Sequence, residues 1–433
     1  MKRGRQAMKE KPSSTVIKKL APLARCVLIL ILILPLFAFT SCTSGTGPEK
    51  PKDDEQTADE FEFAAYEYSL WYYEYAPGQY NGMVFIRVVG ERGIIFNLDI
   101  PGKEFLYYSD IETSGMPEPI EGAYVVTFVF QENQPQSEVY MEGSLTFAND
   151  GKSVSITISD ARGDLAGTAG TYDLINGVDS PAVQRSVYKE VITSVDDSGL
   201  AFVPIYFLYD VDGNGVKELI IREGDSEIEL MYNFLTIDRS GLRFIGSLSG
   251  THSYICLGDD GGIVRFNAHM GYEAVYQIYI NNSQVGESLV FEKVLQGDEE
   301  YDYPAGGELS WLERYDLRLA DSILGEALIK EFFDLYAAGD YAGMKKMMSA
   351  ELANMDFTQG VYGMKTASLR QCRLWVDDEM KASRSDRLLM LCSFEMTAAT
   401  GSVYSPDQTS AAFFIALEPS GGGYRIVGFS TGP

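Results

Sequence analysis

The sequence predicts a multidomain, β-rich α+β protein, and three observations along its 433 residues indicate this class. Short alternating or apolar runs recur over residues 61–178, which is typical of an antiparallel β barrel or sandwich. One amphipathic helix followed by further strand runs occupies residues 179–317, a helix-plus-sheet module. Residues 318–433 place helices first and long strands afterwards, which favours a separate α+β domain.

Residues 1–41 have the layout of a secretory signal peptide. They hold eight basic residues and one acidic residue, and the basic residues all precede an apolar run from Val27 to Phe39. That run of 13 residues is shorter than the ~20 residues that span a bilayer. Two small residues then lead into Cys42. We therefore expect export and cleavage immediately before Cys42.

The segment that ends at Cys42 resembles a bacterial lipoprotein signal, with Phe39 at a position where Leu or Val is usual. The resemblance implies that Cys42 carries acyl chains such as palmitate and anchors the protein on the extracellular face of a Gram-positive cell membrane. The alternative is an ordinary signal peptide in which Cys42 has no role. Residues 43–60 contain no aromatic and no large aliphatic side chain, so we expect residues 42–60 to be a disordered tether.

The acidic composition restricts the partners. The chain holds 35 basic and 62 acidic residues, of which 27 and 61 remain from position 42 onward, a net charge of −34. Such a surface repels phosphate backbones, so we expect no nucleic-acid partner. It is also repelled by anionic lipid headgroups, so the membrane is a partner only through acyl chains on Cys42.

Residues 61–178 are predicted to form the all-β domain. Turn residues such as Asn149-Asp150-Gly151 separate its apolar runs. An aromatic cluster at residues 66–80 has two interpretations, a glycan-stacking platform or strand core with cross-strand pairing. The expected strands are Met83–Val89, Gly93–Leu98, Ala123–Phe130, Val139–Phe147 and Ser153–Ile158.

Residues 179–317 are predicted to be an α+β module. Ser180 is a good N-cap, and Pro181 suits the first helical position because its missing N–H needs no partner there. The helix is expected over 179–196. The strands expected after it are Phe202–Tyr209, Lys217–Arg222, Glu229–Thr236, Leu242–Ser247, Gly262–Asn267, Ala274–Ile280 and Glu287–Val294.

The run Asp-Val-Asp-Gly-Asn-Gly-Val-Lys-Glu at residues 210–218 is the sharpest candidate site. Three oxygen-bearing side chains alternate, and Gly215 follows at the position where a calcium loop turns sharply. Ca²⁺ takes six or more oxygen ligands, and this spacing gathers carboxylates and a backbone carbonyl around one point. The predicted metal ligands are Asp210, Asp212, Asn214, Val216 (through its carbonyl) and Glu218.

The flanks of this loop distinguish it from an EF-hand. Ile221 stands where an EF-hand carries a bidentate Glu, and strand runs rather than helices flank the loop. The loop resembles the Asp-x-Asp-x-Asp-Gly hairpins of integrin-type propeller repeats and a single-copy module of clostridial exported proteins, here with Asn at the fifth position. The resemblance implies a weakly bound structural Ca²⁺, at roughly 10⁻⁴–10⁻³ M. The alternative is a plain hairpin whose Asp and Asn side chains bond their own backbone.

Residues 318–433 are predicted to begin with a helix from Ser322 to Ala338, which Gly339 ends. Asp340 caps a second helix. The expected strands are Ser368–Val376, Arg387–Thr397, Thr409–Leu417 and Tyr424–Phe429.

Two runs in this region carry a family resemblance. Residues 332–341 (Phe-Phe-Asp-Leu-Tyr-Ala-Ala-Gly-Asp-Tyr) and 424–433 resemble nuclear-transport-factor-2-like (SnoaL-like) domains of uncharacterised clostridial lipoproteins. The resemblance covers about a quarter of the chain and implies an α+β cone fold. That fold hosts enzymes, binding proteins and scaffolds alike.

Three cysteines follow Cys42, and an odd count excludes a complete disulfide framework. Cys372 and Cys392 lie on two expected neighbouring strands, so they either form one bridge or remain two buried thiols. Cys256 is the third.

Catalytic motifs give little support for an enzyme. The chain has two histidines, which makes a Ser-His hydrolase or a His-rich metal site hard to assemble. We expect a non-enzymatic, membrane-anchored protein that binds a protein or glycan ligand, or that acts as a scaffold or a sensor. The alternatives are a hydrolase acting on glycans or the cell wall, and a small-molecule carrier that uses the cone cavity of residues 318–433.

Overall fold

The computed structural model describes residues 63–432, apart from 78, 91, 104–108, 121, 133–137, 150–152, 199, 201, 259–260, 297–298, 303–308, 310, 314–315, 317, 360–362, 378–380 and 382–384. The predicted signal peptide, Cys42 and the tether lie outside the described residues. Within them the chain is rich in antiparallel β-sheet and has few helices, which confirms the predicted β-rich class. Among the described helices, none combines the length and the apolar character that a membrane span requires.

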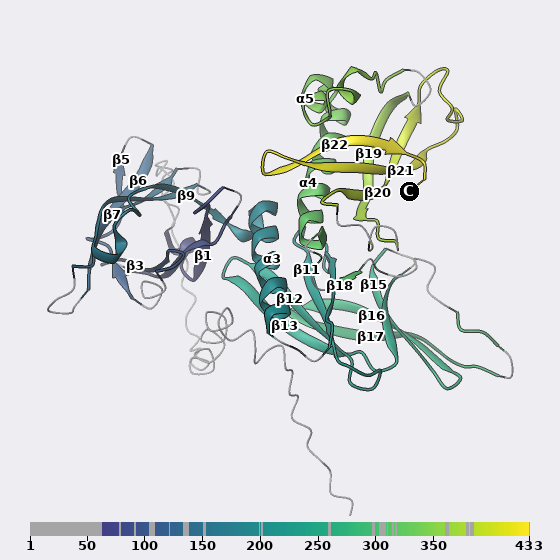
Figure 1. Ribbon diagram of the computed structural model, residues 1–433, viewed down its shortest axis with the longest axis horizontal. Helices are drawn as coiled ribbons and strands as arrows, with labels where there is room; N and C mark the ends of the chain where they lie inside the picture. The colour runs from purple at the N-terminus through teal and green to yellow at the C-terminus, as the bar shows by residue number, and fades with distance from the viewer. Residues whose placement is uncertain are drawn as a thin grey trace, which may run out of the picture.

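Nine strands form one antiparallel sheet that curls into a half-barrel, shown at the left of Figure 1. Alternate side chains point inward because successive residues of a strand face opposite sides. The enclosed core includes Val84, Phe96 and Leu145, all fully buried. The sheet order is β4-β3-β2-β1-β9-β8-β7-β6-β5. The strands are β1 (Ser69–Tyr73), β2 (Gly82–Gly90), β3 (Gly93–Asp99), β4 (Ile111–Glu112), β5 (Glu118–Ile120), β6 (Ala123–Gln131), β7 (Tyr140–Ala148), β8 (Val154–Arg162) and β9 (Gly170–Asn176).

The curl brings the ends of this sheet together. The backbone N–H of Ser114, just after β4, donates to the carbonyl oxygen of Thr127 on β6 at 2.8 Å. Short 3-10 turns lie before β1 and on either side of β9. They are η2 (Phe63–Tyr66), η4 (Gly163–Leu165) and η5 (Gly177–Asp179).

The aromatic cluster near residue 70 is mainly core. Tyr66, Trp71 and Tyr73 are each less than 7% exposed and lie among the inward-facing residues of the curled sheet. Tyr66 also stacks on Trp71 with ring centroids 5.7 Å apart. The glycan-stacking interpretation is therefore wrong for these residues, because a buried ring presents no face to a sugar.

Helix α3 (Pro181–Asp197) leads from the curled sheet into the central part of the chain. The Ser180 side chain accepts a hydrogen bond from the Val183 N–H at 3.4 Å, and Pro181 opens the helix, as predicted. The helix covers one face of a five-stranded antiparallel sheet ordered β13-β12-β11-β10-β18. Its strands are β10 (Ile205–Tyr209), β11 (Glu218–Glu223), β12 (Met231–Asp238), β13 (Gly241–Ser249) and β18 (Trp311–Glu313).

The other face of the five-stranded sheet packs on a second sheet. Tyr206 and Leu208 lie in the same hydrophobic cluster as α3, whereas Ile205 and Phe207 cluster with Ile255 and other residues of the second sheet. Burial on both faces explains why all five residues of β10 and the Leu219–Ile221 run of β11 are apolar or aromatic. The second sheet is ordered β14-β15-β16-β17, with β14 (Ser253–Leu257), β15 (Ile263–His269), β16 (Tyr272–Asn281) and β17 (Gln284–Val294).

The C-terminal part begins with helix α4 (Arg318–Ala338), which starts one turn before the predicted Ser322. Gly339 ends it with φ +73°, and the Asp340 carboxylate accepts a hydrogen bond from the Gly343 N–H at 2.9 Å to cap the next helix. The remaining elements are α5 (Tyr341–Lys346), η6 (Leu352–Asn354), β19 (Met364–Leu374), β20 (Leu388–Ala398), β21 (Ser410–Ser420) and β22 (Gly423–Ser430). The four strands pair in sequence order as one antiparallel sheet.

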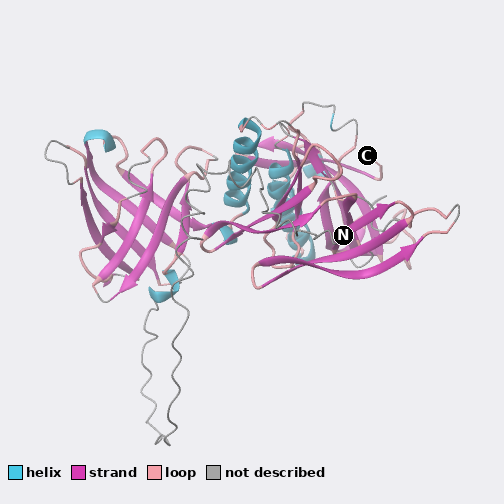
Figure 2. Cartoon of the chain, turned by 90° about the horizontal axis from the view of Figure 1, so that it is seen from below, coloured by secondary structure: helices cyan, strands magenta, loops and turns pink. Residues whose placement is uncertain are grey.

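Helix α4 lies between the central and C-terminal parts, beside α3, as Figures 1 and 2 show. A single hydrophobic cluster contains residues of α3, β10 to β12, α4 and the β19–β22 sheet. Two ion pairs join the same parts. Arg185 Nε on α3 lies 2.6 Å from Asp321 Oδ1 on α4, and Lys217 Nζ lies 2.6 Å from Glu326 Oε1. The two parts therefore share one core.

The Lys217–Glu326 pair gives a test of this shared core. Both side chains are less than one-fifth exposed, and burial raises the pKa of Glu326 while Lys217 opposes the rise. Lys217→Met would leave a largely buried carboxylate without its partner, so we expect a loss of about 3 kcal/mol in unfolding free energy. The double variant Lys217→Met/Glu326→Leu should recover most of it. Denaturant titration measures both.

The exposed pair Arg87–Asp110 on the curled sheet supplies the matched control. Arg87→Met should change the unfolding free energy by about 1 kcal/mol or less, because solvent screens an exposed pair. Equal losses for Lys217→Met and Arg87→Met would contradict a buried pair that joins the two parts.

Candidate functional site

The predicted calcium loop connects β10 to β11 as a hairpin in which Tyr209 pairs with Glu218. Gly213 and Gly215 have φ angles of +73° and +88°. L side chains rarely adopt this left-handed region, so the two glycines let the backbone turn back on itself within a few residues. The loop starts and ends on strands that are buried on both faces, which gives it a rigid base.

The aspartates and the asparagine of the loop bond its backbone. The two carboxylate oxygens of Asp210 accept hydrogen bonds from the N–H groups of Asn214 at 3.1 Å and Gly215 at 2.9 Å. Asp212 Oδ1 accepts from the same Asn214 N–H at 3.2 Å. Asn214 Oδ1 accepts from the Val216 N–H at 2.7 Å. The chain therefore wraps around its own acidic side chains.

Glu218 is the buried acid of the site, with no exposed surface. Its Oε2 accepts from the Val211 N–H and its Oε1 from the Thr236 hydroxyl on β12, both at 2.9 Å. Burial raises the pKa of Glu218 to about 7, and the nearby Asp212 and Asp210 charges add to the rise. The hydrogen bonds from Val211 and Thr236 lower the pKa and so oppose this rise.

Asp210, Asp212 and Glu218 each place a carboxylate oxygen within 4.8 Å of the other two. Three anions so close repel one another in the partly buried surroundings, and a cation among them would remove that repulsion. Carboxylate oxygens are the donors that hard cations prefer, so the donor set fits Ca²⁺.

All four predicted side-chain ligands already accept hydrogen bonds, and the fifth ligand is the carbonyl of Val216, a buried residue. Asn214 uses its side-chain oxygen on the Val216 N–H, and the Val216 side chain is 3% exposed within the core shared with α4. The same bonds fit the plain hairpin interpretation, and the convergence of the three carboxylates, one of them buried, is compatible with both interpretations. Thr236, which orients Glu218, was not foreseen, because nothing in the sequence near residue 236 indicates which strand lies beside the loop.

A cleft of about 620 Å³ lies beside the loop, between α4 and β19. Asp210 and Lys217 line it from the loop, Glu326 and Lys330 from α4, and Cys372 from β19. The cleft therefore brings together the central and C-terminal parts of the chain, and pockets between such parts are common binding sites.

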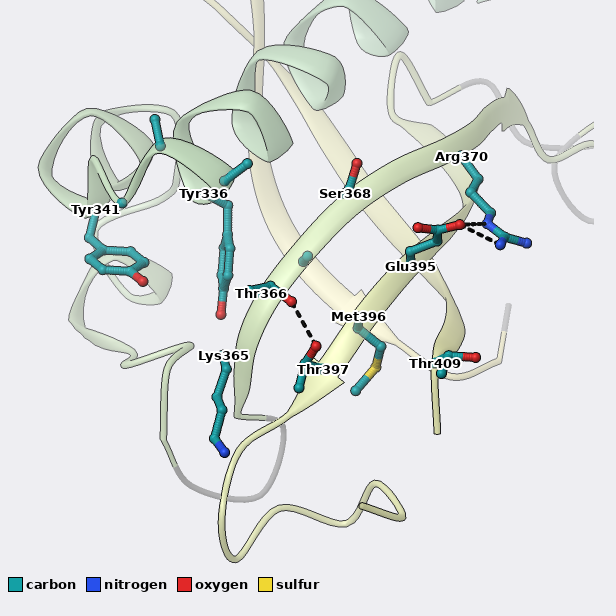
Figure 3. A pocket seen from close by; sticks show the side chains of 14 residues that line it. Tyr336, Tyr341, Lys365, Thr366, Ser368, Arg370, Glu395, Met396, Thr397 and Thr409 are labelled. Carbon is teal, nitrogen blue, oxygen red and sulfur yellow. Dashed lines mark hydrogen bonds and ion pairs between the residues drawn. The ribbon is translucent and has the colours of Figure 1, made fainter. Parts of the chain in front are cut away.

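A second cavity of about 590 Å³ lies where α4 ends over β19 and β20. Figure 3 shows its polar lining, with the Thr366 hydroxyl bonded to Thr397 at 2.9 Å and Arg370 paired with Glu395. The space between α4 and the sheet is filled by buried side chains that include Phe332, Met390 and Ile415. Residues of β19 line both hollows.

The histidines lie apart from both cavities and line neither. The rings of His252 and His269 stack with centroids 3.7 Å apart, and His252 Nδ1 lies 3.2 Å from Glu227 Oε2. Stacked rings turn their faces, not their nitrogens, toward each other.

The shifted pKa of Glu218 predicts a pH-dependent stability. The carboxyl titrates near 4.5 in the unfolded chain and near 7 in the folded one, so the folded state binds more protons between these values. In calcium-free buffer, wild type should therefore lose stability relative to Glu218→Gln as pH rises from about 4.5 to about 7, by on the order of 3 kcal/mol, with no further change above.

Urea unfolding at several pH values measures this difference. Glu229→Gln is the matched control because Glu229 is exposed in the next turn, and its difference from wild type should stay flat over the same range. A flat difference for Glu218→Gln as well would show that burial does not raise this pKa.

No family model, curated protein or solved structure matches the chain.

Proposed function

We propose that this is a lipid-anchored extracytoplasmic protein with a binding, scaffold or sensor role, whose β10–β11 loop binds a structural Ca²⁺. Asp210, Asp212 and Glu218 would supply carboxylate oxygens, and Asn214 and the Val216 carbonyl would complete the ligand set predicted from the sequence. The observation that carries the metal site is the convergence of the three carboxylates within 4.8 Å around a buried glutamate. The cost of burying Glu218 among other acids is what Ca²⁺ would offset.

The proposed location makes a weak site useful. The basic, apolar and small-residue pattern before Cys42 supports export and acylation, and two acyl chains suffice for stable anchoring. Outside the cell, calcium at about millimolar concentration would load a loop with a dissociation constant of roughly 10⁻⁴–10⁻³ M. Inside, the same loop would remain empty.

The protein would combine a β barrel or sandwich, an integrin-type calcium-loop module and a nuclear-transport-factor-2-like domain. The hairpin between β10 and β11 supports the integrin-type loop module, and the order of two helices followed by four antiparallel strands supports the nuclear-transport-factor-2-like assignment. The curled nine-stranded sheet supports the predicted barrel or sandwich.

The cleft beside the loop supports a binding role over a catalytic one. Two of its buried charges, Lys217 and Glu326, are already paired with each other. Catalytic acids are usually held in environments that leave them poised to exchange protons with substrate. Because Asp210 and Lys217 line the cleft while Asp210 also belongs to the acidic loop, calcium would fix one wall of the cleft.

Calcium titration tests the metal site. At a tenfold excess over the dissociation constant, Ca²⁺ should stabilise the wild-type protein by about 1.4 kcal/mol, seen as a rise in melting temperature and as heat in calorimetry. Asp212→Ala should abolish both effects because it removes one of the three converging carboxylates. Asp225→Ala, in the exposed turn after β11, should retain them. Absence of heat and of any melting shift in wild type at millimolar calcium would exclude the site.

Metabolic labelling tests the anchor. Cys42→Ala should abolish incorporation of labelled palmitate and release the protein into the medium, because the acylated sulfur is lost. Cys26→Ala, within the signal segment, should keep the label. Palmitate incorporation that survives Cys42→Ala would overturn the anchor assignment.

A further inference from the structure

Cys372 on β19 and Cys392 on β20 face each other directly across two antiparallel strands. Their sulfur atoms lie 3.2 Å apart, in contact and unbonded. Directly opposed residues of an antiparallel pair have Cα atoms about 4.5 or 5.5 Å apart, depending on the hydrogen-bonding position. Both values fall in the range of about 4.4–6.8 Å that disulfides require. A bond between the two sulfurs therefore needs no movement of the strands.

We propose that Cys372 and Cys392 are a redox site, where a disulfide-bearing oxidant converts the two thiols into a cross-strand disulfide that fastens β19 to β20. Among the described strands, β19 lies at the edge of the four-stranded sheet and pairs with β20 alone. The same strand lines both cavities. The disulfide would fix the wall of the cleft beside the acidic loop.

The two sulfurs differ in access, and this sets the order of the chemistry. Cys372 lines the cleft, whereas Cys392 is fully buried. The oxidant therefore meets Cys372 first. Burial raises the pKa of the Cys372 thiol, and the contact with Cys392 raises it further. A protonated thiol reacts slowly, which is typical of a structural bond rather than of a catalytic thiol.

The step balances as an ordinary thiol–disulfide exchange. The Cys372 thiolate attacks one sulfur of the oxidant, here oxidised glutathione, which forms a mixed disulfide and releases one glutathione thiolate. The Cys392 sulfur then loses its proton and attacks Cys372, which releases the second glutathione thiolate. Two protein thiols lose two electrons and two protons, and one oxidised glutathione becomes two reduced molecules.

The cysteine pair belongs neither to the acidic loop nor to the membrane anchor, so it can be tested without either. The test uses the full-length chain carrying Cys26→Ala and Cys42→Ala, so that three thiols remain. The protein is incubated with oxidised glutathione, denatured, alkylated and mapped by mass spectrometry. We expect a linked peptide pair joining Cys372 to Cys392, and an alkylated Cys256, which lies buried on β14 in another sheet.

Two further measurements make the outcome decisive. The oxidised protein should melt roughly 5 °C higher than the same protein after reduction, since the bond closes a loop of about 20 residues. This comparison needs no new variant. Cys392→Ser, or Cys392→Ala if the serine variant fails to fold, should retain one glutathione on Cys372.

The contrary results are equally specific. If both cysteines of the parent are alkylated after oxidation while Cys392→Ser holds glutathione, the pair does not close and the proposal is wrong. If Cys372 captures no glutathione in that variant, the cleft does not admit the oxidant and the proposal is also wrong.

Discussion

The packing of α4 between two sheets is the interaction on which the arrangement of the central and C-terminal parts depends. The first six residues of α4 are all buried, so this end of the helix has no solvent-facing side. Farther along, Gly325 allows close approach to the C-terminal sheet. A Cβ there would come within 2.9 Å of a Leu417 methyl carbon. Such close-packed contacts are lost when either neighbour moves away. The helix therefore holds the sheet of residues 364–430 against the loop of residues 210–217.

A buried carboxylate is the second constraint, and it joins fold to chemistry. Glu218 opens β11 and precedes the apolar run Leu219-Ile220-Ile221, and burial opposes its ionisation. One backbone N–H and one hydroxyl donate to its carboxylate, and they offset the cost of burying the charge only in part. A strand would be more stable with an apolar residue at this position, since an isolated buried charge is costly. A polar group retained at such a cost is commonly one that serves a site.

The local structure could be predicted from the sequence where the signal was local. Ser180 with Pro181 marked the start of α3, and Gly339 with Asp340 marked the break between α4 and α5, because capping is settled within a few residues. β9 was not predicted, and β1 was only one interpretation of the aromatic cluster at 66–80, since these strands pair with each other between residues about 100 positions apart, such as Trp71 and Asn176. The three acids of the loop were predicted from spacing alone. Thr236 and the cleft were not, because they depend on which elements become neighbours.

The path of the chain through the central sheets has a consequence for folding. The five-stranded sheet is built from β10 to β13, the chain then forms the whole second sheet, and only afterwards does β18 return to pair with β10. Phe207 and Trp311, which pair there, are separated by about 100 residues. Closing so long a loop costs conformational entropy before any contact repays it. We therefore expect β18 to join the sheet late in folding, after β10 to β13 have paired locally.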